Sequence, residues 1–370
     1  MKTIINTEKD FAAESKLSAM GWNDFFQTHV NSSGIPARVI AVNKGLFQLS
    51  NGDKCLQATL SGKVRHNASL SNELYPVTGD WVLTHDTVIT QVLPRQNALS
   101  RGAAGSRGKN NATATGEQVI AANLDTVCIV CGLDRDYNIR RIERYLTLIY
   151  NCGLSPVIVL TKADLHDAPE NCLTEIEQIA FDVPVHLVSA ECSTGLLELE
   201  QYLGQGKTVT MIGSSGAGKS TLLNRLYGKC IQTTGSVSQS VGKGKHTTTG
   251  RDLIFMPQGG MLIDNPGIRE IAFYENDGGV ESAFADIEYF AQECRFSDCS
   301  HTNEHGCNVM KAVENGELSQ ARLKSYYKMK RELAYLSDRQ SKSSDRVEKE
   351  RWRDVSLQIK SMYKNSRKRR

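Results

Sequence analysis

The chain has 370 residues and a formal net charge of +3; 40% of its residues are hydrophobic and 23% are charged. This length accommodates two or three domains, and this composition excludes a disordered or fibrous protein. No apolar run approaches the ~20 residues that span a membrane as a helix. The first thirty residues also lack the apolar stretch of a signal peptide. We therefore expect a cytoplasmic protein with no membrane partner.

The small net charge conceals a basic C-terminus. Residues 322–370 contain 17 Lys and Arg against 6 Asp and Glu, a net +11, which leaves 27 against 35, a net −8, on the rest. A basic segment on an acidic body indicates an anionic partner, although a solvated lysine-rich helix has the same composition.

The first two segments in chain order are an extension and a small barrel. Residues 1–34 form an N-terminal extension whose Trp22, Phe25 and Phe26 fit either a docking helix or packing against the next domain. Residues 35–96 contain about five short strands separated by turns, which predicts a small β-barrel. An OB-fold is common at this size, and an SH3-like barrel without a nucleic-acid role is the alternative.

Residues 97–118 are rich in Gly, Ala, Asn and Ser, which predicts a linker or loop. Between 119 and 277, apolar strands alternate with amphipathic helices, which predicts a parallel sheet with helices on both faces. Cys128 and Cys131 form a CxxC pattern inside one of these apolar runs. Because no second Cys or His pair lies nearby, we interpret them as buried strand thiols in a reducing compartment.

A phosphate loop follows the apolar run 208–212. The sequence GSSGAGKST at 213–221 has glycines that allow backbone N–H groups to converge on phosphates, ahead of a helix N-terminus that favours anions. Lys219 would bridge the β- and γ-phosphates, and the Ser220 hydroxyl would ligate Mg²⁺. The predicted contacts with nucleotide are Gly213, Ser214, Ser215, Gly216, Ala217, Gly218, Lys219, Ser220 and Thr221. This loop alone does not select ATP or GTP.

Two further segments belong to the same site. DNPG at 264–267 follows an apolar strand, so Asp264 is placed to hold the Mg²⁺ shell and the Gly267 N–H to meet the γ-phosphate, although these residues also form ordinary turns. Between the two lies a hydroxyl-rich loop, 236–250, that could order around Mg²⁺, or could be a plain surface loop. One of Thr247, Thr248 and Thr249 would supply the second metal hydroxyl, and Thr248 is the residue that we assign.

A base-reading segment lies upstream. Thr161, Lys162, Ala163 and Asp164 end one apolar strand, and Ser189 and Ala190 end the next. A carboxylate at Asp164 accepts hydrogen bonds from guanine N1–H and the exocyclic amine together, and adenine has no such pair of donors. The Lys162 stem could pack over the base, and the backbone near Ser189 and Ala190 could meet the guanine oxygen. These segments predict that the protein binds GTP rather than ATP. The sequence LSGGQ, which marks transporter-type ATPases, does not occur in the chain, so that class is disfavoured.

The order of these motifs resembles that of the circularly permuted GTPases, because the base reader precedes the phosphate loop. The barrel, EQVIAANLD (117–125), GKHTTTG (244–250), DNPGIRE (264–270) and the cysteine-rich region behind resemble the small-ribosomal-subunit biogenesis GTPase family, over roughly residues 35–330. The resemblance implies an OB domain, a permuted GTPase domain (119–277) and a zinc domain acting on the small (30S) subunit and its 16S rRNA. It also implies late subunit maturation and GTP hydrolysis to GDP that the subunit stimulates.

Two positions depart from GTPase patterns. Such GTPases usually have Asn where this chain has Thr161, so we expect weaker anchoring of the loop or base without loss of guanine preference. No glutamine follows DNPG. His246, which matches a histidine of the family, is the candidate that orients the attacking water, with an exposed loop histidine as the plainer interpretation. A non-catalytic, nucleotide-sensing rRNA scaffold remains the alternative function.

A cluster of metal ligands follows in a predicted helical domain, 278–338. Its spacing is C-x4-C-x-H-x5-C, from Cys294, Cys299, His301 and Cys307. Three thiolates and one imidazole predict one closed, structural Zn²⁺ site, with His305 as the second choice of histidine. The last segment, 339–370, is a basic tail. We expect the protein to be monomeric.

Overall fold

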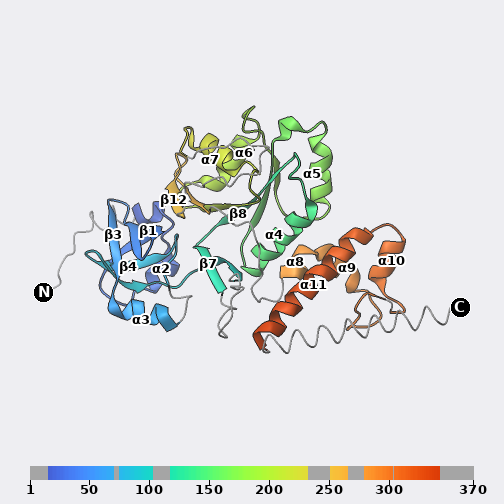
Figure 1. Cartoon of the computed structure of the whole chain (residues 1–370), viewed down its shortest axis with the longest axis horizontal. Coiled ribbons are helices and arrows are strands. Elements are labelled where there is room, and N and C mark those ends of the chain that lie inside the picture. Colours follow the sequence, from blue (N-terminus) through green and yellow to red (C-terminus); the bar gives the residue numbers. More distant parts are fainter. Residues whose placement is uncertain are drawn as a thin grey trace, which may run out of the picture.

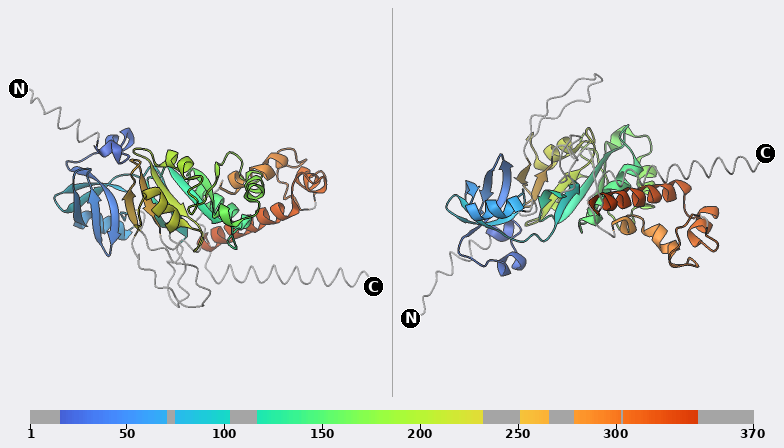
Figure 2. Two further views of the ribbon diagram at one scale, coloured as in Figure 1. Left: turned by 90° about the horizontal axis from the view of Figure 1, so that it is seen from above. Right: turned by 60° about the horizontal axis from the view of Figure 1, so that its bottom comes forward.

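The computed structural model describes residues 16–70, 75–102, 117–231, 251–265, 279–302 and 304–341. A barrel and a helical C-terminal part lie at opposite ends of the molecule, with an α/β part between them (Figures 1 and 2). Within those residues, no helix has both the length and the apolar character required to span a membrane.

The barrel consists of five short strands. They are β1 (Ile35–Asn43), β2 (Leu46–Ser50), β3 (Cys55–Leu60), β4 (Trp81–His85) and β5 (Val88–Val92). The order β1-β2-β3-β5-β4 closes on itself because β4 also pairs with β1, and β3 pairs with β5 in parallel. One helix, α3 (Gly62–Leu70), connects β3 to the β4–β5 pair. This is the OB-fold expected from the strand spacing.

The N-terminal residues that the structure describes pack against the barrel. Helix α2 (Asp24–Thr28) begins after Asn23, whose side chain accepts a hydrogen bond from the Phe25 N–H. The Trp22 ring lies 4.8 Å from the Trp81 ring between centroids, and the fully buried Phe26 lies 5.9 Å from it. Of the two interpretations that the sequence left open, the structure supports packing.

The segment expected to be a linker, 97–118, differs from that expectation at both ends. Residues Ala98–Gly102 form β6, which pairs antiparallel with β7 (Glu117–Ala122). Leu99 of β6 and Ile120 of β7 are completely buried, so these strands gain enough apolar contact to order. The Gly-rich and Asn-rich composition between them concealed this signal, and residues 103–116 lie outside the described residues.

Six strands form the central sheet within the part of the chain that the structure describes. They are β8 (Thr126–Gly132), β9 (Pro156–Thr161), β10 (Val185–Leu187), β11 (Thr208–Ile212), β12 (Asp252–Phe255) and β13 (Met261–Asp264). Their order is β10-β9-β8-β11-β13-β12, and only β12 runs antiparallel to its neighbour. The helices of this part are α4 (Ile139–Asn151), α5 (Pro169–Glu177), α6 (Leu196–Glu200) and α7 (Lys219–Tyr227), with 3-10 turns η2 (Ala163–Leu165) and η3 (Gln201–Leu203).

The CxxC residues lie on β8 with their side chains in separate cores. Cys128 packs in the cluster that contains Val209 and Leu222, whereas Cys131 packs in the cluster that contains Ile142. Side chains three residues apart on a strand point to opposite faces, so these thiols do not approach one another. Burial raises the pKa of Cys128 to about 12 and that of Cys131 to about 11. The interpretation as buried strand thiols agrees with this geometry.

The barrel and the central sheet are hydrogen-bonded into one sheet of eleven strands through β1 and β12, which pair at Ala41 and Asp252. Strand β12 lies between the two parts (Figure 1). Arg38 of β1 is buried beside this junction and donates hydrogen bonds to the carbonyls of Met20, Gly79 and Asn123.

The C-terminal part is helical. It contains α8 (Gly279–Ala283), α9 (Ala285–Ala291), α10 (Asn308–Glu314) and the long α11 (Gln320–Ser341). Gly279 packs directly on α4, where its N–H donates to the Asn151 side chain over 2.9 Å. Arg322 of α11 reaches the buried Glu143 of α4 over 2.8 Å, so α4 carries the contact between the two parts.

Candidate nucleotide site and metal cluster

The phosphate loop occupies residues 213–218, between the end of β11 and the start of α7. Gly213, Gly216 and Gly218 have φ angles of 152°, 90° and 93°, values that side-chain-bearing residues seldom adopt. At Gly213 space is also lacking, since a Cβ there would lie 2.2 Å from the Val130 carbonyl oxygen. The Lys219 ammonium donates to the Gly213 and Ser214 carbonyls over 2.8 and 2.6 Å. The lysine therefore folds back across its own loop.

The predicted base-reading segment contacts the phosphate loop directly. The Thr161 hydroxyl at the end of β9 donates to the Ala217 carbonyl over 2.6 Å, and the Lys162 ammonium donates to the Gly216 carbonyl over 2.7 Å. Thr161 is 3% exposed, and Lys162 has a left-handed backbone conformation with φ 59°. These bonds join segments more than fifty positions apart in the chain. The Thr161 hydroxyl anchors the end of β9 to the phosphate loop, although threonine lacks the side-chain amide of the usual asparagine.

The other base-reading residues lie at the same edge of the sheet. Asp164 follows on η2 and is exposed, while the Ala163 N–H donates to the Val188 carbonyl over 3.3 Å. Ser189 is buried and closes a turn in which it exchanges two backbone hydrogen bonds with Thr194, each of 3.1 Å. Ala190 follows this residue. The structure therefore brings both base-reading segments together.

Asp264 ends β13, the strand parallel to β11 on the side away from β8. The Thr210 hydroxyl of β11 donates to the Ile263 carbonyl over 2.8 Å and accepts from the Asn265 side chain over 2.7 Å. These bonds hold the end of β13 against β11, the strand that leads into the phosphate loop. Three predicted residues, His246, Thr248 and Gly267, lie outside the described residues.

A third loop, which sequence reasoning missed, touches both nucleotide loops. It follows β8, and its Asp134 accepts a hydrogen bond of 2.6 Å from Lys162, while its Asp136 accepts one of 2.5 Å from the Ser214 hydroxyl. Burial tends to raise the pKa of Asp134, but its hydrogen bonds and the charge of Lys162 outweigh burial and lower it. Two acidic residues directly after a buried strand were the available signal.

The four predicted metal ligands converge. One ligand atom from each of Cys294, Cys299, His301 and Cys307 lies within 4.8 Å of every other. His301 Nδ1 is 3.6 Å from the sulfurs of both Cys294 and Cys307, which lie 4.0 Å apart. Ligands of one tetrahedral ion with bonds of roughly 2.0–2.3 Å have similar separations. This Cys/His cluster can hold a metal, and His301, not His305, is its histidine.

Backbone groups orient the thiols of the cluster. The Asn308 N–H donates to the Cys294 sulfur over 3.3 Å, and the Met310 N–H donates to the Cys307 sulfur over 3.4 Å. Burial tends to raise the pKa of Cys294, but N–H groups at the start of α10 outweigh it and lower that pKa. These bonds favour the thiolate, which is the form that binds metal.

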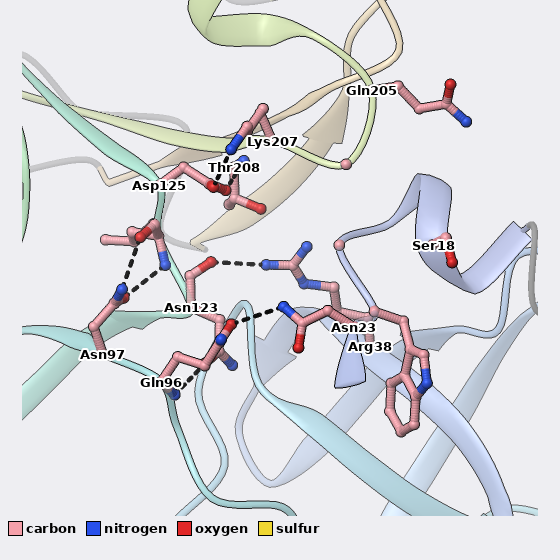
Figure 3. Close-up of a pocket in the computed structure, with 14 residues that line it drawn as sticks. Ser18, Asn23, Arg38, Gln96, Asn97, Asn123, Asp125, Gln205, Lys207 and Thr208 are labelled. Atoms are coloured by element: carbon pink, nitrogen blue, oxygen red, sulfur yellow. Dashed lines mark hydrogen bonds and ion pairs between the residues drawn. The ribbon is translucent and has the colours of Figure 1, made fainter. Parts of the chain in front are cut away.

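A cavity of about 480 Å³ lies at the opposite end of the strands (Figure 3). Its lining comes from the N-terminal segment, Arg38 of β1, residues 96–97, the residues before β8 and the start of β11. The cavity therefore belongs to the junction of the two parts. Its polar groups bind one another: Lys207 pairs with Asp125 over 3.0 Å, and the Asn23 side chain donates to Gln96 over 3.1 Å. None of the residues that line this cavity belongs to the nucleotide loops.

The strand order and the loops define the class of the central domain. The nucleotide loops that the structure describes follow the carboxyl ends of adjacent parallel strands, where ligands bind in open α/β sheets. Strands β8 to β10, which carry the base-reading segments, precede β11 in the chain but complete the same sheet. The domain is therefore a circularly permuted P-loop GTPase.

Comparison with known proteins identifies the family. The model of the RsgA GTPase family matches residues 92–274. "Small ribosomal subunit biogenesis GTPase RsgA" of Syntrophotalea carbinolica is 45% identical over 328 residues, which cover 86% of this chain and 90% of that protein. The protein of that name in Methanosarcina acetivorans is 40% identical over 353 residues, 93% and 92% of the two chains. This chain belongs to the RsgA GTPase family, and it is a GTP hydrolase.

Solved structures share its architecture. YjeQ from Thermotoga maritima matches with a TM-score of 0.59 and 30% identity, over 82% of this chain and 99% of that one. YloQ, described as a circularly permuted GTPase, matches with a TM-score of 0.56 and 22% identity, over 84% and 98% of the two chains, which supports the fold alone.

Proposed function

We propose that this protein binds the small (30S) ribosomal subunit through its 16S rRNA and assists its late maturation, hydrolysing GTP to GDP and phosphate with stimulation by the subunit. The names of its relatives, small ribosomal subunit biogenesis GTPases, support the choice of partner. The observation that carries the nucleotide-binding part is the pair of hydrogen bonds that joins the base-reading segment to the phosphate loop.

Each nucleotide loop has a distinct task in this proposal. Asp164 accepts hydrogen bonds from guanine N1–H and the exocyclic amine, and the stem of Lys162 packs over the base. The backbone N–H groups of residues 213–218 bind the phosphates together with Lys219. Ser220 and Asp264, with Thr248, would hold Mg²⁺, which neutralises charge that develops on the phosphates. The Gly267 N–H meets the γ-phosphate.

The Cys/His cluster would hold one structural Zn²⁺. Its ligand separations suit a tetrahedral site, and three thiolates with one imidazole suit zinc better than Mg²⁺ or Ca²⁺. All four positions come from protein side chains, so no open position remains for catalysis.

Binding to rRNA would use positive charge on the barrel and on the C-terminal segment. Lys44, Lys54, Lys63 and Arg65 are exposed on the barrel. Contacts with phosphates release counterions, so affinity for the subunit should fall steeply as salt rises. We also propose that the domains begin near residues 35, 119 and 278, and that the protein is cytoplasmic and monomeric.

His246 is proposed to orient the attacking water. The residues after DNPG are Ile268, Arg269 and Glu270, so no glutamine is available there. A neutral imidazole with an ordinary pKa of about 6.5 serves this purpose near neutral pH. We expect slow intrinsic hydrolysis, because in this proposal His246 acts on the water only when the subunit is bound.

The test is GTP hydrolysis by the wild type and His246→Ala, each with and without purified small subunits. A large stimulation that the mutation abolishes, while GTP binding persists, would support both the function and the role of His246. Stimulation that survives the mutation would remove His246 from the mechanism. No stimulation under conditions where the subunit binds would overturn the proposed stimulated hydrolysis in favour of a nucleotide-sensing scaffold.

A further inference from the structure

The loop between β8 and α4, residues 133–138, contacts the phosphate loop and the base-reading segment at the same time. Asp136 accepts from the Ser214 hydroxyl over 2.5 Å, and Asp134 pairs with Lys162 over 2.6 Å. Gly132, just before this loop, leaves room for the Asp134 carboxylate, because a Cβ there would lie 2.8 Å from Asp134 Oδ1. One short loop thus fixes a side chain in each nucleotide-binding segment.

The loop is itself held in place. Asn138 caps α4, where its side chain accepts from the Arg141 N–H over 3.1 Å. The Asp136 N–H donates to the Asp134 side chain over 3.1 Å, and Arg141 forms an ion pair with the Asp136 carboxylate. On the other side, the Tyr137 hydroxyl donates to Glu175 of α5 over 2.8 Å. The Asp136 carboxylate therefore has little freedom to move.

A carboxylate next to a polyphosphate site would normally weaken anion binding. Here both carboxylates have a cationic partner: Arg141 beside Asp136, and Lys162 beside Asp134. The side chain of Asp136 is 16% exposed, which limits the screening of its pair with Arg141 by solvent. The arrangement supplies a strong hydrogen-bond acceptor for Ser214 without an uncompensated negative charge.

We propose that Asp136 is a positioning residue of the nucleotide site, which holds the phosphate loop through Ser214 in the conformation that receives the phosphates of GTP and GDP. The inference rests on the proposed assignment of residues 213–221 to nucleotide binding. When a loop is already ordered before binding, less conformational entropy is lost as the ligand binds. The contact therefore raises the affinity for both nucleotides. Asp136 does not itself touch nucleotide.

The test is a double-mutant cycle read by the Kd of a fluorescent GDP analogue. Asp136→Ala and Ser214→Ala should each raise Kd about tenfold, the change expected when one charge-assisted hydrogen bond is lost. The double variant should bind no more weakly than either single variant, because both remove the same contact. Asp136→Asn, which keeps an oxygen acceptor, should recover most of the affinity.

Tyr137→Phe is the matched control. It removes a hydrogen bond of similar length from the same loop, directed to α5 instead of the phosphate loop, and should leave Kd unchanged. Effects that add in the double variant, or an equal loss in Tyr137→Phe, would overturn the proposal. If Asp136→Ala does not fold, as judged by circular dichroism, Ser214→Ala and Asp136→Asn decide by the same readout.

This outcome is separable from that of the proposed function. The measurement uses the free protein and GDP, with no ribosomal subunit. Wild-type protein that binds GDP tightly but is not stimulated by the subunit would contradict the proposed function and leave this inference intact. A wild type that is stimulated while the cycle is additive would do the reverse.

Discussion

Thr161 illustrates how one side chain connects distant segments. Its hydroxyl lies at the carboxyl end of β9 and donates to the Ala217 carbonyl, in a place where solvent has almost no access. The sequence predicted weaker anchoring because threonine lacks the amide of asparagine. The structure retains an anchor because the shorter side chain still reaches the carbonyl at 2.6 Å.

Thr161→Val should therefore weaken nucleotide binding. The isosteric change leaves the Ala217 carbonyl without the Thr161 hydroxyl as donor, at a cost of about 1–3 kcal/mol. Part of this cost lowers the free energy of unfolding, and part loosens the phosphate loop. We expect a lower Tm and a GDP Kd raised by about tenfold, measured by thermal unfolding and fluorescence titration. Thr161→Ser keeps the hydroxyl and serves as control; if it binds as weakly as Thr161→Val, the hydroxyl is not the cause.

The cysteines should differ sharply in reactivity. Burial raises the pKa of Cys128 to about 12 and that of Cys131 to about 11, whereas Cys55, Cys192 and Cys230 are exposed. At pH 8 the buried thiols carry almost no thiolate, so alkylation of the folded protein should modify the exposed three and spare the two on β8. Mass spectrometry of peptides checks this, and denaturant should abolish the difference. Modification of Cys128 in folded protein would contradict the packing.

At the scale of elements, α4 is the helix that connects the nucleotide site with the C-terminal part. Glu143 is completely buried and accepts hydrogen bonds from Arg322 and Ser325 of α11. Arg322 also pairs with Asp286 over 2.9 Å and stacks on Phe284 with its guanidinium 4.2 Å from the ring centroid. When one member of such a buried ion pair is removed, the charge that remains is uncompensated and the folded protein is strongly destabilised.

Arg322→Ala should destabilise the protein by about 3–5 kcal/mol, because it removes the buried cation from Asp286 and leaves Glu143 paired with the more exposed Arg140. The decrease is measured as a shift of the denaturant midpoint. Lys330→Ala, on the same helix but half exposed and 4.0 Å from its carboxylates, should change stability by at most about 0.5 kcal/mol. A similar effect of the two substitutions would show that the buried network is unimportant.

Removal of metal should affect the C-terminal part first. If the Cys/His cluster holds zinc, a strong chelator should expose residues 294–307 to protease while the nucleotide loops still bind GDP. Metal binding requires deprotonated thiols, so affinity should fall as pH decreases. Limited proteolysis with metal analysis checks this, and Cys299→Ser should reproduce it. His305→Ala is the control, because that histidine is not among the converging ligands.

At the scale of the whole molecule, strand pairing and hydrogen bonds attach the barrel directly to the GTPase domain. The pairing of β1 with β12 is reinforced by the Thr78 hydroxyl, which donates to the Arg251 carbonyl over 2.8 Å. Arg38 adds hydrogen bonds to the N-terminal segment and the barrel. It also donates to the Asn123 carbonyl in the chain before β8 (Figure 3). Burial lowers its pKa to about 10, which still leaves it charged at neutral pH.

Arg38→Met should loosen this junction. It removes the donor for three buried carbonyls, and we expect a loss of about 3 kcal/mol or more. Because Trp22 and Trp81 lie on the barrel side, tryptophan fluorescence should change at lower denaturant than nucleotide binding is lost. Arg65→Met, exposed on the same barrel, should behave as the wild type; coincident transitions in Arg38→Met would contradict the role of the junction.

Much of the nucleotide site could be predicted because its signals are local. The spacing of the glycines, Lys219 and Ser220 specifies a backbone shape and a helix start within nine residues, and the cluster around His301 depends on a short spacing of ligands. Asp134 and Asp136 escaped prediction because their partners, Lys162 and Ser214, lie far along the chain. The ends of 97–118 were wrongly assigned as linker because pairing between β6 and β7, and not composition, orders them.

The sequence by itself determined the class of protein and the order of its parts, since each depends on residue types at short spacing and on the order in which the strands follow one another along the chain. Only the tertiary structure decided which buried charges meet, how the loop after β8 holds both nucleotide segments, and that β1 and β12 make one sheet of two domains. These features arise from contacts between residues tens to hundreds of positions apart, and no local pattern encodes which partners they choose.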